Sequence, residues 1–164
     1  MRLMRKGFTL VETLVYLALY AILVGGALAA AYSIFESQAR NETAAIIEEE
    51  GVFLIGKIDW ALSGADSVQS PSISGSTLSL TRSDGSTVRI RSVGSNIRIQ
   101  ENGAPEEVLN NTNASVTSLV FIHSFSTSDG LDPESMSASF MVQATTSDGH
   151  VLSQSFSALK YLRK

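Results

Sequence analysis

Apolar residues are concentrated at the start of the chain. From Phe8 to Ile34, 27 residues form an almost unbroken apolar run in which Glu12 is the only charge. As a helix at 1.5 Å per residue, a run of this size is about 40 Å long. Because a hydrocarbon core is about 30 Å thick, the pattern predicts a transmembrane helix over 8–34, with some tilt or margin.

The helical periodicity continues beyond the membrane run. Between Asn41 and Leu62, apolar residues recur at spacings that share one helical face: Ile47, Leu54, Ile55, Ile58 and Leu62. The acidic residues lie largely off that face: Glu42, Glu48, Glu49, Glu50 and Asp59. Gly51 and Gly56 weaken the helix locally. We therefore expect an amphipathic continuation of the helix over 35–65.

Residues 66–164 change to the alternation of apolar and polar positions that is typical of strands. The runs expected to be strands are Thr77–Arg82, Thr87–Val93, Asn96–Gln100, Val116–Phe125, Ser139–Thr146 and Val151–Leu162. Ser-Asp-Gly turns around Asp84 and Asp148 connect two pairs of them as hairpins. Strands of this length need neighbours, so we expect an antiparallel sheet that packs on the apolar helix face. The predicted fold class is α+β.

Charge orients the span. Three of the twelve basic residues precede Gly7 (Arg2, Arg5 and Lys6), which directs the N-terminus to the cytoplasm and the domain at 66–164 to the periplasm or exterior. Without residues 1–7 the chain has nine basic and sixteen acidic residues, a formal charge of −7. Such a charge disfavours nucleic acid as a partner. The chain has no cysteine, which excludes disulfides and zinc fingers.

Glu12 is the main candidate for a functional residue. An acid at the centre of a span costs roughly 2.5–3.5 kcal/mol on insertion scales, so a membrane protein retains one where something pairs with it. The alternative is that Glu12 snorkels to the headgroups. Thr9 and Thr13 are interpreted as helix residues whose hydroxyls bond to the backbone.

The N-terminus resembles the type IV pilin and pseudopilin family. The resemblance lies in Lys6-Gly7 followed by Phe8-Thr9-Leu10-Val11-Glu12 and an uninterrupted span, over about 35 residues. It implies that prepilin peptidase cuts between Gly7 and Phe8 and methylates the new amine of Phe8. It also implies that Glu12 pairs with the amine of a neighbouring subunit in a filament. The implied partners are other pilin or pseudopilin subunits, an inner-membrane assembly platform and the lipid bilayer.

The order of a helix followed by a strand meander is similar to the minor pseudopilins of type II secretion, particularly the J-type subunit. The similar features are the TLSL and VTSLVF strands, the Val108-Leu109-Asn110 step and the C-terminal Lys160-Tyr161-Leu162-Arg163. Many major pilins carry a C-terminal disulfide and a mid-span proline. This chain has neither, so the resemblance favours a minor subunit located first in the inner membrane and then in a filament.

No constellation for catalysis appears in the sequence, and we expect no enzyme. His123 and His150 lack the spacing of metal ligands. Serines next to Asp84, Asp129 and Asp148 lie in turns, without a base to activate them.

Two polar clusters have an alternative interpretation. The loop from Ser128 to Glu134 contains Asp129, Asp132 and Glu134. Such oxygen-rich loops can hold calcium, but the EF-hand pattern is missing and a solvated acidic loop is favoured; no other cofactor is indicated. Four arginines on neighbouring predicted strands suggest either a DNA-binding patch or, as we favour, the solvent face of a sheet: Arg82, Arg89, Arg91 and Arg98.

The rival hypothesis is a signal-anchored protein whose single span tethers an adhesion or ligand-binding domain. Among pilin roles, the sequence leaves secretion, motility, adhesion and DNA uptake open. The expected organisation is a cleaved leader at 1–7, a transmembrane helix at 8–34, an amphipathic helix at 35–65 and an exported β domain at 66–164.

Overall fold

The computed structural model describes residues 9–125 and 133–162. The chain forms two compact units, Met1–Arg40 and Asn41–Lys164. Helix α1 (Leu10–Ser63) is the only described element of the first unit and provides the first element of the second. The expected helix is therefore present, and it ends at Ser63.

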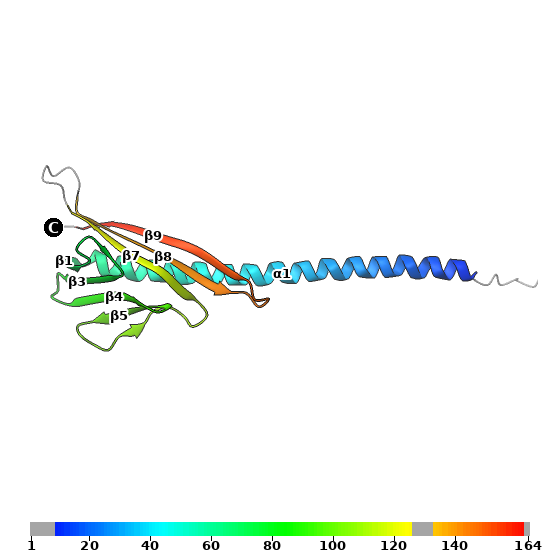
Figure 1. The fold of residues 1–164 in the computed structure, drawn as a ribbon, viewed down its shortest axis with the longest axis horizontal. Helices are drawn as coiled ribbons and strands as arrows, with labels where there is room; N and C mark the ends of the chain where they lie inside the picture. Colours follow the sequence, from blue (N-terminus) through cyan, green and yellow to red (C-terminus); the bar gives the residue numbers. More distant parts are fainter. Residues whose placement is uncertain (1–8, 126–132, 163–164) are drawn as a thin grey trace, which may run out of the picture. The chain divides into compact units, whose positions relative to one another are not determined.

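Within the described residues, nine strands follow the helix (Figure 1). Their bounds are β1 (Ala65–Ser70), β2 (Ser74–Gly75), β3 (Thr77–Arg82), β4 (Thr87–Val93), β5 (Asn96–Glu101), β6 (Glu107–Val108), β7 (Ser115–Ser124), β8 (Ser135–Thr145) and β9 (Val151–Tyr161). Every pairing is antiparallel. The strands form two sheets, with orders β1-β3-β4-β5-β6 and β2-β7-β8-β9. The pilin-like α+β architecture is confirmed, and its strands are divided between two sheets.

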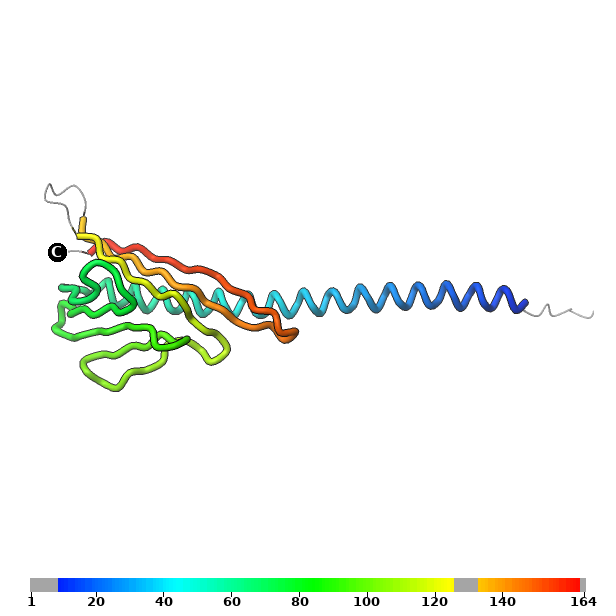
Figure 2. Tube along the Cα trace, viewed as in Figure 1, coloured from blue at the N-terminus to red at the C-terminus, as the bar shows by residue number. Residues whose placement is uncertain are grey.

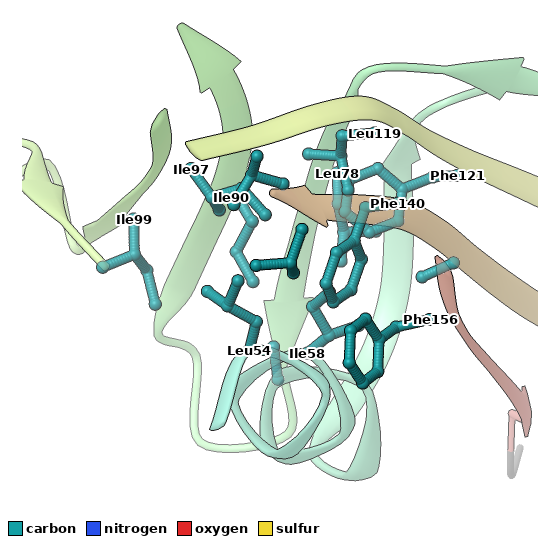
Figure 3. Close-up of a cluster of buried hydrophobic side chains, with 14 of the residues drawn as sticks. Leu54, Ile58, Leu78, Ile90, Ile97, Ile99, Leu119, Phe121, Phe140 and Phe156 are labelled. Carbon is teal, nitrogen blue, oxygen red and sulfur yellow. The ribbon is translucent and has the colours of Figure 1, made fainter. Parts of the chain in front are cut away.

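The second unit is held together by apolar side chains from the helix and both sheets. The predicted helix face supplies Ile47, Leu54, Ile58 and Leu62, each at most 3% exposed, while Ile55 packs at the margin. In Figure 3, Leu54 and Ile58 rise from the helix into the cluster, and Ile58 lies beside Phe140 and Phe156. Full burial of a side chain of this size contributes about 1.5–3 kcal/mol, so this face accounts for much of the attachment of the helix to the sheets.

Polar residues beside that face join the helix to β9 and the β6–β7 loop. Lys160 Nζ lies 2.8 Å from Asp59 Oδ1, and Gln154 donates to Glu48 Oε2 at 2.6 Å. The Glu50 carboxylate accepts a hydrogen bond from the Asn111 backbone at 3.0 Å. Three of the acids that the sequence places off the apolar face thus link the helix to the β domain: Glu48, Glu50 and Asp59.

The hairpins follow the predicted turns. Gly85 and Gly149 have φ of 81° and 87° in the β3–β4 and β8–β9 turns, a backbone region where glycine is favoured. β8 and β9 pair over their whole length without a register shift, and Figure 2 shows their traces side by side. β7 carries an irregularity between Thr117 and Val120, where Ser118 has a φ of 58°. That bulge lets both Val116 and Leu119 face the core.

Candidate functional site

The N-terminal end of α1 is closed by Thr9. The Glu12 amide donates to the Thr9 carbonyl at 3.1 Å and to Thr9 Oγ1 at 3.3 Å, the arrangement of an N-cap. Thr13 Oγ1 donates to the Leu10 carbonyl at 2.8 Å. The interpretation of Thr9 and Thr13 as residues bonded to the backbone is confirmed. Glu12 consequently lies in the first turn of the helix, where the helix dipole favours negative charge.

Glu12 has a side-chain partner one turn further along the helix. The Tyr16 hydroxyl donates to Glu12 Oε1 at 3.3 Å, and Glu12 is half-buried. Residues four apart share a helix face, so the spacing of Glu12 and Tyr16 was visible in the sequence, but sequence reasoning did not identify the pair. In an apolar environment, one hydroxyl donor reduces the desolvation cost of the carboxylate without neutralising it.

The rest of the span is apolar and uncovered within the described chain. No residue of the most apolar stretch of this helix is buried. Large side chains from Leu10 to Phe35 are exposed, many by more than half: Leu10 at 77%, Ile22 at 73% and Tyr32 at 74% are examples. An apolar surface of this kind requires lipid or other helices. Gly7 and Phe8, the predicted processing residues, lie outside the described residues.

Three of the four arginines on the five-stranded sheet contact other side chains. Arg91 makes two hydrogen bonds to Glu106, from Nε to Oε1 at 2.7 Å and from Nη2 to Oε2 at 2.8 Å. Arg98 Nη1 lies 4.0 Å from the same carboxylate, and the Arg82 guanidinium lies 4.4 Å from the centroid of the Trp60 ring. The hydrogen bonds from Arg91 are the main reason that the pKa of Glu106 is lowered. Arg82, Arg91 and Arg98 are thus engaged by other side chains of the same unit.

His123 is buried at one end of β7 and has an acidic partner. Its Nε2 lies 2.8 Å from Glu134 Oε1, and the His123 side chain is 4% exposed. Of the predicted calcium ligands, Glu134 is thus in contact with a histidine, while Asp129 and Asp132 lie outside the described residues. No group of three or more potential metal ligands occurs within 9–125 and 133–162.

The two described Ser-Asp-Gly sequences are turns, as predicted. Asp84 Oδ1 accepts a hydrogen bond from the Ser86 amide at 2.8 Å, and Asp148 accepts one from the Thr146 hydroxyl. The main reason that the pKa values of both aspartates are lowered is a hydrogen bond from a hydroxyl, that of Ser86 to Asp84 and that of Thr146 to Asp148. The third such aspartate, Asp129, lies outside the described residues.

Comparison with known families identifies the N-terminal site. The family model described as the prokaryotic N-terminal methylation motif matches residues 2–28. This stretch includes Gly7, Phe8, Glu12 and Tyr16. No curated protein and no solved structure matches the chain.

The match gives the N-terminus a biological context. The chain carries the methylation motif of the type IV pilin and pseudopilin family, which confirms the resemblance of its N-terminus to that family. The match does not support the resemblance to the J-type subunit. That family is structural and non-enzymatic. The motif implies processing by prepilin peptidase and assembly with other pilins. Together with the apolar helix, it indicates an inner-membrane anchor before assembly.

Proposed function

We propose that this chain is a structural subunit of a type IV pilus or a type II secretion pseudopilus. It is inserted as a single-span precursor, cut between Gly7 and Phe8 and methylated at Phe8. Its leader is residues 1–7, its transmembrane segment 8–34, its amphipathic helix 35–65 and its exported domain 66–164. The observation that carries the proposal is the methylation motif at 2–28, which extends into the exposed apolar part of α1.

In this proposal Glu12 sets the register of assembly. Cleavage after Gly7 creates an ammonium group four residues before Glu12, at the same end of the span. Each charge alone is costly in an apolar bundle, and pairing between neighbouring subunits offsets part of that cost. Packing of the exposed apolar helices drives assembly, and Tyr16 supports the carboxylate with its hydroxyl at 3.3 Å.

The proposed subclass is a minor subunit, with the J-type minor pseudopilin as the most similar kind. The support is the order of elements, one helix followed by an antiparallel meander, and the absence of cysteine from the chain. The assembly platform of the inner membrane is its further partner, and the β domain faces the periplasm or the exterior. Because Glu12 is present, we expect another subunit ahead of this one in the filament.

The mass of the purified membrane form tests this function. Loss of residues 1–7 together with a gain of one methyl group supports the pilin subunit. An intact Met1 supports the rival, a span that tethers an adhesion or binding domain. Glu12→Ala is expected to leave cleavage and methylation unchanged but to prevent incorporation into filaments. Normal incorporation of that variant would refute the pairing between Glu12 and the amine.

A further inference from the structure

Asn102 and Gly103 form the centre of a tight turn that follows β5. Both have positive φ, 50° and 73°, and the Ala104 amide donates to the Glu101 carbonyl at 2.8 Å. These are the features of a type I′ turn, in which Asn-Gly is a favoured pair. Of the six asparagines in the chain, Asn102 is the one that precedes a glycine.

The same pair of residues has a chemical weakness. The backbone nitrogen that follows an asparagine can attack the side-chain amide carbon, and glycine has no Cβ to obstruct that approach. Asn102 and Gly103 are both exposed, and nothing lies within 4 Å of the position of a Gly103 Cβ. Within residues 9–125 and 133–162 the Gly103 amide makes no hydrogen bond. Water therefore has access to the proton of this amide.

The Asn102 side chain is held by the backbone of Thr87. The Thr87 amide donates to Asn102 Oδ1 at 2.9 Å, and the Asn102 amide donates to the Thr87 carbonyl at 2.9 Å. Attack on Asn102 Cγ places negative charge on Oδ1, and a donor about 2.7–3.1 Å from such an oxygen stabilises that charge. The Thr87 amide thus lies where a donor that stabilises the oxyanion is required.

We propose that Asn102 is a site of spontaneous deamidation in the folded protein and that the Thr87 amide directs the product to aspartate. The Gly103 nitrogen loses its proton to water and bonds to Asn102 Cγ. The bond between Cγ and Nδ2 then breaks, and Nδ2 leaves as ammonia after it takes a proton from water. Water adds to the Cγ carbonyl of the resulting succinimide, and the Gly103 nitrogen leaves Cγ and regains a proton. Water is the only co-reactant.

The hydrogen bond from Thr87 selects between the two carbonyls of the succinimide. Water at the Cγ carbonyl gives aspartate, which tolerates the positive φ of the turn and keeps the oxygen that accepts from Thr87. Water at the backbone carbonyl gives isoaspartate, which inserts a carbon into the backbone and disrupts both bonds between residues 102 and 87. The folded turn therefore gains one negative charge and keeps its shape. This inference does not depend on N-terminal processing or on Glu12.

The test follows the full-length protein in detergent micelles during incubation at mildly alkaline pH. Peptide mapping by mass spectrometry assigns the exchange of NH2 for OH to individual asparagines, and protein isoaspartate methyltransferase measures the isoaspartate. Asn113 is the internal control, because it is exposed in a turn but precedes Ala114. A synthetic peptide of residues 98–106 has the same sequence around Asn102 without the Thr87 amide.

Two variants isolate the amide of Thr87. Thr87→Pro removes the N–H group at the first residue of β4, where proline is tolerated, and Thr87→Ala keeps it. We expect Asn102 to react several-fold faster than Asn113 in wild type and in Thr87→Ala, with aspartate as the main product. In Thr87→Pro we expect a reaction about tenfold slower, a smaller loss than in a water-excluded site because the turn is exposed. In this variant and in the peptide, isoaspartate should be the main product.

Three results would overturn the proposal. The first is deamidation of Asn102 no faster than that of Asn113. The second is the same ratio of aspartate to isoaspartate in the folded protein and in the peptide. The third is an equal rate and an equal product ratio in Thr87→Pro and Thr87→Ala. If the melting temperature showed that Thr87→Pro does not fold, the comparison of the folded wild type with the peptide would decide the role of the Thr87 amide.

Discussion

The ring of Phe156 on β9 lies against Gly51 of α1, at a point where a side chain would overlap it. A Cβ atom on Gly51 would fall inside contact distance of three ring carbons of Phe156. In the sequence, Gly51 predicts only local weakness of the helix. In the structure it allows the helix and β9 to approach closely enough to bury both residues.

Gly51→Ala is therefore expected to destabilise the protein although alanine is the better helix former. The gain in helix propensity is about 1 kcal/mol, whereas overpacking of a core contact costs about 1–3 kcal/mol. Gly56 is the matched control because nothing lies within 4 Å of its Cβ position. Gly56→Ala should stabilise the helix by about 0.5–1 kcal/mol. Urea unfolding of the two variants measures the difference, and a stabilised Gly51→Ala would contradict the contact.

The pair formed by Arg91 and Glu106 makes stability depend on pH. The pKa of Glu106 is lowered mainly by its hydrogen bonds from Arg91. A carboxylate with a lowered pKa stabilises the fold above its ordinary value, about 4.3 for glutamate. That contribution is lost as the pH falls through the lowered pKa. Glu106→Gln should therefore flatten the decrease in unfolding free energy between about pH 5 and pH 3.

Two arginine substitutions serve as the comparison for this pair. Arg91→Gln removes the hydrogen-bond donors and is expected to flatten the same part of the profile. Of the three arginines that lower the pKa of Glu106 through their charge, Arg89 contributes least. Arg89→Gln should consequently leave the profile close to wild type. If the unfolding free energy of Arg91→Gln changed with pH as that of wild type does, the pair formed by Arg91 and Glu106 would not contribute to the pH dependence.

Local sequence patterns were sufficient for most elements but not for their partners. The 3.6-residue periodicity identified the buried helix face through Ile47, Leu54, Ile58 and Leu62, and alternation identified β3, β4 and β5. β2 and β6 were not predicted because strands of two residues carry no periodic signal and depend on pairing with β7 and β5. The division into two sheets likewise depends on long-range pairing.

The candidate sites show the same distinction. The motif around Glu12 is contiguous in sequence and was found there. The contact between Arg91 and Glu106 joins residues fifteen apart through the fold of β4 and β5, and the contact between His123 and Glu134 joins β7 to the residue that precedes β8. Neither separation has a fixed geometry in sequence, so the sequence did not predict an acidic partner for Arg91 or for His123.

Removal of the carboxylate from Glu134 should destabilise the end of β7. Because the His123 side chain is 4% exposed, water has little access to it once Glu134 is gone. Loss of a buried hydrogen-bond partner costs about 1–3 kcal/mol, so Glu134→Ala should lower the unfolding free energy by this amount. Glu134→Gln retains an oxygen acceptor and should cost less. Glu107→Ala, at an exposed position, is the control, and an equal loss there would exclude a specific role of the pair.

Calcium is expected to leave the stability of the protein unchanged. Glu134, the described member of the acidic loop, already contacts His123, and the solvated loop is the favoured interpretation. Exported calcium modules bind with dissociation constants of about 0.1–1 mM. Such a site would add about 1.4–2.7 kcal/mol at 10 mM calcium. Thermal melts with calcium, and with magnesium as the control, test this prediction. An increase in melting temperature that is specific to calcium would establish a calcium site.

Tyr16→Phe provides a graded test of the carboxylate at the start of the helix. It removes the hydroxyl that lies 3.3 Å from Glu12 Oε1 and keeps the ring. Hydrogen bonds to charged groups contribute about 1.5–3 kcal/mol, so the variant should be processed normally but recovered in sheared filaments several-fold less than wild type. Tyr20→Phe removes an exposed hydroxyl one turn further along the helix and should assemble as wild type does. If Tyr16→Phe assembled normally while Glu12→Ala failed, the tyrosine would have no part in holding the carboxylate for its neighbour's amine.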